Sequence, residues 1–148
     1  MNSPILALES YWLAQAMKYS TWLYPTVETV HIWGVGMLFG SVVLMDLRVL
    51  GLVKALDYSA LSRLGIAVSL LGFSLAVLTG SMLFITHAGD LIASRLFILK
   101  MCLIFLLITN AVLLRMRVVI NATTKAQAVI SLVGWASVIG LGRWLAYV

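Results

Sequence analysis

The sequence predicts an all-α fold, an integral membrane four-helix bundle with a short N-terminal interfacial helix. Hydrophobic residues make up 63% of the 148 residues and charged residues only 10%, whereas soluble domains are about half apolar and a quarter charged. The apolar residues also gather into four long runs. A chain of this length has no room for a second domain, so residues 1–148 are expected to form a single transmembrane domain.

Each of the four runs is long enough to cross a bilayer, whose hydrocarbon core needs about 20 apolar residues per helix. We expect spans at about 23–45, 64–86, 95–115 and 126–146. Small residues at positions i and i+4 predict where helix backbones approach, because close packing holds helices together in lipid. These pairs are Gly36–Gly40, Ala76–Gly80 and Ala136–Gly140.

A shorter helix is expected at about residues 3–19, beginning near Ser3 and Pro4. It is too polar and too short to span, so we expect it to lie on the membrane surface. Aromatic side chains suited to the headgroup level follow along it, at Tyr11, Trp12, Tyr19 and Trp22.

Lys and Arg in the connecting segments predict the orientation, because these residues are enriched in cytoplasmic loops. The first and third connections with their edges hold Arg48, Lys54, Arg63, Arg115, Arg117 and Lys125, and the other side holds Lys18, Arg95 and Arg143. Both termini are therefore expected outside the cytoplasm. Topology accounts for the net charge of +5, and no nucleic-acid partner is expected.

Four ionisable side chains stand within the spans or at their ends, where an unpaired charge is costly. Counted by helix rise, Glu28, His31, Lys100 and Arg143 all fall in the outer third of the bundle. His87 comes at the outer end of the second span. Two interpretations stay open: a structural ion pair of Glu28 with Lys100 or Arg143, or a cluster around a ligand.

In the second interpretation His31 is the metal or haem ligand, because neutral imidazole offers a nitrogen lone pair. Glu28 would orient it or move protons, and Lys100 and Arg143 would hold haem propionates or a quinone oxygen. By helix rise, His87 lies about 10 Å nearer the membrane surface than His31. It would be a second haem ligand only if the two rings came closer than this. Six residues of the first span share one helical face and form a stripe with polar members that must face protein: Tyr24, Glu28, His31, Val35, Val42 and Asp46.

Motifs of the common enzyme classes are missing from the sequence. No serine stands in a recognisable catalytic-triad motif, and no phosphate-binding glycine pattern occurs. Whether the chain is an enzyme therefore stays open. The lone cysteine, Cys102, lies in an apolar run and is expected to be a small buried hydrophobe.

Three segments carry a resemblance to a family of small uncharacterised bacterial inner-membrane proteins: WLYPTVETVHIWGVGMLFGSVVLMDLRVLGL at 22–52, SRLFILKMCLIFLLITNAVLL at 94–114 and GRWLAY at 142–147. More distantly, the chain is similar to the copper-resistance protein D family and to the HemJ-type protoporphyrinogen IX oxidase family. His31 followed by a Gly-rich stretch, and Lys100 early in a later span, match both. The first of these likenesses implies copper handling and the second implies haem b with quinone-linked redox chemistry.

The expectation that follows is a haem b or related redox cofactor bound by His31 in a bacterial inner-membrane protein with both termini periplasmic. Such a protein would carry electrons between quinone and a periplasmic partner, or be the small membrane subunit of such a complex. The alternative is a non-catalytic accessory or transport protein for copper or another ion, with a structural polar cluster. A homo-oligomer or a larger membrane complex is compatible with either.

Overall fold

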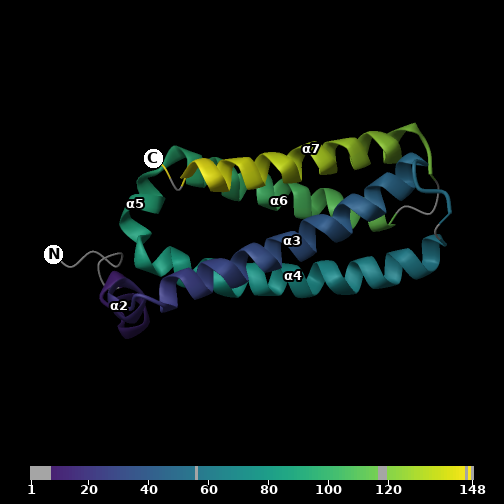
Figure 1. The fold of residues 1–148 in the computed structure, drawn as a ribbon. Helices are drawn as coiled ribbons and strands as arrows, with labels where there is room; N and C mark the ends of the chain where they lie inside the picture. Colours follow the sequence, from purple (N-terminus) through teal and green to yellow (C-terminus); the bar gives the residue numbers. More distant parts are fainter. Residues whose placement is uncertain (1–7, 56, 117–119, 146, 148) are drawn as a thin grey trace. The chain divides into compact units, whose positions relative to one another are not determined.

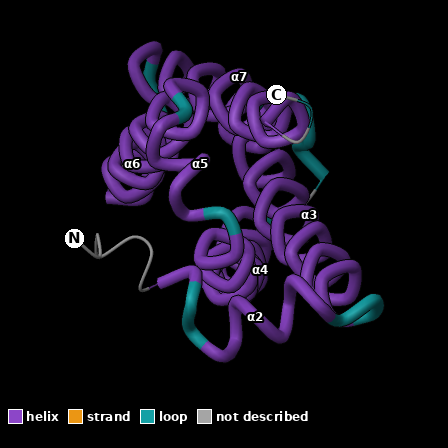
Figure 2. Tube along the Cα trace, turned by 90° about the vertical axis from the view of Figure 1, so that its left-hand side faces the viewer, coloured by secondary structure: helices purple, strands orange, loops and turns teal. Residues whose placement is uncertain are grey.

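The structure is a computed structural model that describes residues 8–55, 57–116, 120–145 and 147. The described residues form helices joined by turns and loops, without a strand (Figure 2). The elements are α2 (Trp12–Tyr19), α3 (Leu23–Leu50), α4 (Tyr58–Thr86), α5 (Ala88–Ala93), α6 (Arg95–Met116) and α7 (Ala122–Leu145), in the order of Figure 1.

Four of these helices, α3, α4, α6 and α7, are long and apolar enough to cross a membrane. Between 6% and 33% of the most hydrophobic stretch of each is buried inside the protein. Large apolar side chains such as Trp33, Leu70 and Phe105 are more than half exposed. Exposed apolar surface on this scale is untypical of a soluble protein, and it agrees with the predicted four spans.

α3 extends beyond its predicted span at the C-terminal end and α4 at the N-terminal end. A residue that favours a helix terminus stands at each of these two ends. α3 continues to Leu50 and stops at Gly51, whose φ of +85° suits glycine. There Leu52 N–H donates to Leu47 O at 3.1 Å and Gly51 N–H donates to Arg48 O at 3.1 Å. α4 begins at Tyr58, six residues before the predicted start at 64, because Asp57 caps it: Ala60 N–H donates to Asp57 Oδ2 at 2.8 Å.

The other two apolar helices match their predictions more closely. α6 begins at Arg95 as expected. α7 begins at Ala122 rather than 126, because Asn121 and Thr124 cap it reciprocally. Thr124 N–H donates to Asn121 Oδ1 at 3.0 Å and Asn121 N–H donates to Thr124 Oγ1 at 2.7 Å. Residue 146, the predicted end of this span, lies outside the described residues.

The N-terminal segment is not one continuous helix in its described part. Residues 8 and 9 are helical, the chain turns at Ser10, and α2 begins after Tyr11, whose backbone is extended. The turn brings Glu9 back onto α2, where two contacts hold it. Gln15 Nε2 donates to Glu9 O at 2.9 Å, and Lys18 Nζ lies 3.0 Å from Glu9 Oε2. Ser3 and Pro4, the predicted start, lie outside the described residues.

α2 buries one side and exposes the other, as an interfacial helix would. Ala14 and Met17 are buried, at 0% and 1% exposure. The expected headgroup-level aromatic residues are all exposed: Tyr11, Trp12, Tyr19 and Trp22. The segment at 87–94, predicted only as a connection, contains the short helix α5.

The contacts divide the chain into two compact units. The first unit comprises residues 1–38 and 69–94, and the second comprises residues 39–68 and 95–148. α3 and α4 each contribute to both units, α2 and α5 belong to the first, and α6 and α7 to the second.

In the first unit, α3 and α4 cross with their backbones in contact. A Cβ atom on Gly72 would stand 2.6 Å from both Gly34 O and Leu38 N, and one on Gly34 would stand 2.9 Å from Ala76 N. The predicted pairs Gly36–Gly40 and Ala136–Gly140 do not mark such contacts, because Gly36, Gly40 and Gly140 have nothing described within 4 Å of a Cβ position. Hydrophobicity and spacing cannot tell which glycines of a helix face its neighbour.

In the second unit, α6 and α7 lie side by side (Figure 1). Gly134 of α7 faces Leu107 of α6 at close range. A core of Val49, Leu114 and Ala128 joins α3, α6 and α7, with Leu50 packed against it. Cys102 is exposed on α6, so the expectation of a buried cysteine is wrong.

Candidate functional sites

His31 lies at the α3–α4 crossing of the first unit, three residues before Gly34. Its ring packs on the backbone of α4 at Gly80, where a Cβ would stand 3.1 Å from His31 Cε1. Gly80 therefore leaves room for the imidazole. The predicted pair Ala76–Gly80 thus does mark a close approach, and at Gly80 the group that approaches is a histidine side chain.

A chain of two hydrogen bonds fixes the ring of His31. Its Nδ1 lies 3.0 Å from Thr79 Oγ1, and the Thr79 hydroxyl donates to Leu75 O at 2.6 Å. Because the only hydroxyl hydrogen goes to Leu75, Thr79 Oγ1 acts as the acceptor toward His31, and we assign the Nδ1–H tautomer. In this tautomer Nε2 carries the lone pair.

His87 stands in a different place from His31 within the same unit. It precedes α5, is exposed, and meets the ring of Tyr24 edge-on with centroids 6.1 Å apart. Tyr24 comes seven residues before His31 on α3, which is about 10 Å along the helix. The two histidines are therefore not gathered at one point.

Glu28 is exposed on α3, unlike the rest of the stripe predicted to face protein. Tyr24, His31 and Val35 are partly buried, and Val42 and Asp46 are buried. The side chain that hydrogen-bonds His31 Nδ1 and orients its ring is Thr79. The sequence had suggested this orienting role for Glu28. Thr79 comes 48 residues later in the chain, and no local pattern connects it with His31.

Lys100 and Arg143 belong to the second unit and lie near one another's helices. Lys100 is partly buried, and its Nζ would be 3.2 Å from a Cβ on Gly142, the residue before Arg143. The guanidinium of Arg143 is exposed and lies over the ring of Tyr147, 4.8 Å from its centroid, and also hydrogen-bonds the Tyr147 hydroxyl. The predicted four-residue cluster thus has two members in each unit.

The most deeply buried ionisable side chain described is Asp46, on α3 in the second unit, at 1% exposure. It hydrogen-bonds the side chain of Ser131 on α7, and Arg115 of α6 acts on it electrostatically. Asp46 lies on the predicted polar stripe of the first span but belongs to none of the predicted sites. A signal for it is present on α7, where Gln127, Ser131 and Trp135 follow at intervals of four and so share a face.

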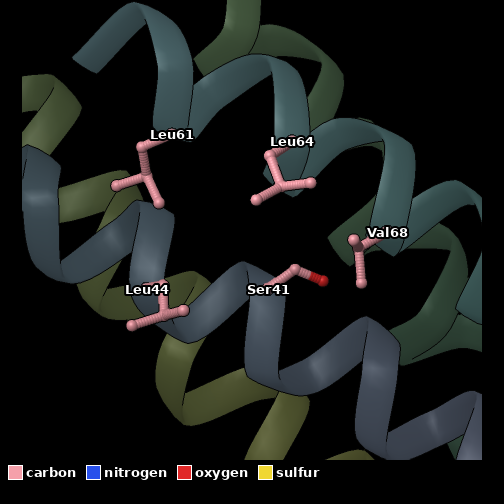
Figure 3. A pocket seen from close by; sticks show the side chains of 6 residues that line it. Ser41, Leu44, Leu61, Leu64 and Val68 are labelled. Atoms are coloured by element: carbon pink, nitrogen blue, oxygen red, sulfur yellow. The ribbon is translucent and has the colours of Figure 1, made fainter. Parts of the chain in front are cut away.

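A small pocket also lies in the second unit, between α3 and α4 (Figure 3). Its volume is about 140 Å³, and leucine and valine side chains of α4 face Leu44 and the hydroxyl of Ser41 across it. The pocket is almost wholly apolar. Its lining residues are Ser41, Leu44, Leu61, Leu64, Gly65 and Val68.

Comparison of the chain with protein-family models, with curated proteins and with solved structures finds no match.

Proposed function

We propose that this chain is a membrane protein that binds haem b, or a related redox cofactor, through His31. The observation that supports the proposal most is the hydrogen bond from His31 Nδ1 to Thr79. Histidines that ligate metals generally donate their other ring N–H to a fixed acceptor, which sets the tautomer and the ring orientation. The Thr79–Leu75 arrangement is of that kind.

The residues of the first unit fit a single histidine ligand. In the assigned tautomer His31 Nε2 has the lone pair that iron requires. Thr79 holds the opposite nitrogen, and the missing side chain of Gly80 accommodates the ring against α4. Because His87 stands beside Tyr24, it is not a haem ligand in this proposal. Bound haem would supply a one-electron carrier.

In this proposal the chain passes electrons between quinone and a periplasmic partner, or is the small membrane subunit of a complex that does. It is set in a bacterial inner membrane with both termini in the periplasm. The four apolar helices support a multi-pass protein, and the excess of basic residues in the first and third connections supports this orientation.

An optical spectrum of the purified protein tests the proposal, with haem supplied during expression. We expect a Soret band that is lost in His31→Ala and kept in His87→Ala, the matched control because this chain has only these two histidines. A protein without a Soret band, or a band that survives His31→Ala unchanged, contradicts the proposal. A protein without the band would instead belong with accessory or transport proteins.

A further inference from the structure

Asp46 is enclosed by helices of the second unit. It is 1% exposed, and Ser131, which hydrogen-bonds it from α7, is 2% exposed. One turn further along α3, Val49 packs with Leu114 and Ala128 in the core of the unit. A carboxyl group so placed loses its contacts with water, and each oxygen left without a hydrogen-bond partner is costly.

The hydrogen bonds around Asp46 leave two acceptors without a donor. Among the described residues, Asp46 Oδ2 has no hydrogen-bond partner, and neither has Gln127 Oε1, which is also buried. Gln127 stands one turn, or about 6 Å, before Ser131 on the same face of α7. A proton on Oδ2 would remove the charge of the carboxylate and turn an acceptor that lacks a donor into a hydroxyl group.

Among the described residues, Asp46 has no partner in a direct ion pair. The Lys18–Glu9 ion pair lies in the first unit. On α6, Arg115 is only partly buried and acts on Asp46 through space. On α4, Tyr58 acts on Arg115, and α7 presents the neutral Ser131 and Gln127. Arg48 comes two residues after Asp46 on its own helix and is partly buried.

We propose that Asp46 is a buried proton-binding site, whose Oδ2 takes up a proton from water and returns it while Ser131 holds the carboxyl group in place. The step forms one O–H bond and converts the carboxylate into a neutral carboxylic acid. Arg115 stays charged, because its long side chain can carry the guanidinium toward the surface. This proton uptake does not involve His31, which belongs to the other unit.

Infrared difference spectroscopy of the full chain in lipid vesicles between two pH values tests this. We expect a C=O stretching band of a protonated carboxylic acid that grows as the pH falls. The band should be absent in Asp46→Asn and kept in Asp57→Asn, in which the replaced carboxylate is exposed and caps α4. A band that is absent from the wild type, independent of pH, or unchanged in Asp46→Asn overturns the proposal.

Ser131→Ala provides a second test that does not depend on Asp46→Asn folding. Loss of the hydrogen bond from Ser131 should move the band to higher frequency, and an unmoved band contradicts the assignment. Titration with sodium at constant pH examines the competing occupant, a metal cation. Loss of the band as sodium is added would make Asp46 a cation site and overturn the proton site.

Discussion

Thr79 of α4 accepts a hydrogen bond from Nδ1 of His31 of α3, with the two atoms 3.0 Å apart. The contact joins residues 48 positions apart in the chain. It depends on the close α3–α4 crossing at Gly34 and Gly72 and on the space left by Gly80. These relationships predict how substitutions in the first unit change haem binding and stability.

Thr79→Val keeps the shape of the side chain and removes the acceptor. We expect it to lower haem affinity by about 10- to 100-fold, the usual effect of losing a partner of a ligating histidine. The measurement is a haem titration followed at the Soret band. Thr109→Val is the control, because the Thr109 side chain is exposed and its hydroxyl donates within its own helix, to Phe105 O. Equal affinities in the two variants would disprove the orienting role of Thr79.

Gly72→Ala should destabilise the first unit. Its Cβ would stand 2.6 Å from backbone atoms of Gly34 and Leu38, which cannot move away as a side chain can. Overpacking of this kind costs about 1–3 kcal/mol. Thermal unfolding in detergent measures it. Gly36→Ala, where a Cβ meets nothing within 4 Å, should be neutral or slightly stabilising, because alanine favours helix. A Gly72→Ala protein that unfolds like Gly36→Ala would show that the crossing is looser than described.

The link between Glu9 and α5 should break in acid. A hydrogen bond from Gly89 N–H, at 2.9 Å, and then one from Lys18 hold the pKa of Glu9 below its ordinary value. Since the folded pKa lies below the unfolded one, ionised Glu9 contributes its stability above the unfolded pKa. That contribution is lost as the pH falls through the folded pKa.

The amide resonance of Gly89 reports this titration in an NMR experiment. We expect it to shift at acidic pH in the wild type and to lose that shift in Glu9→Gln. The Ala60 amide is an internal control, because it donates to Asp57, whose pKa is lowered by hydrogen bonds from Ser59 and Ala60. Its titration should be the same in both proteins. A Gly89 shift that persists in Glu9→Gln would rule out Glu9 as its source.

Reporter fusions check the proposed orientation. Alkaline phosphatase, which is active only outside the cytoplasm, should be active when fused after Val148 and inactive when fused after Lys54, in the connection between α3 and α4. The basic residues of that connection favour the cytoplasm. The opposite pattern would invert the topology, and equal activities at both sites would contradict the three spans expected after Lys54.

The sequence alone determined the four apolar helices, because length and hydropathy are summed along a single run and need no partner. Local signals set one boundary of α3 and one of α4: Gly51 follows the C-terminus of α3, and Asp57 caps the N-terminus of α4. Those two signals were present in the sequence, although the predicted spans stopped short of them.

Only the tertiary structure decided which groups meet. Gly34 and Gly72, rather than Gly36 and Gly40, form the α3–α4 contact, because facing depends on the crossing of two helices and not on spacing within one. The same holds for His31 with Thr79 and for Asp46 with Ser131, whose partners lie 48 and 85 residues further along the chain. Depth along a helix can be counted from the sequence, but the direction of a side chain relative to another helix is set by packing alone.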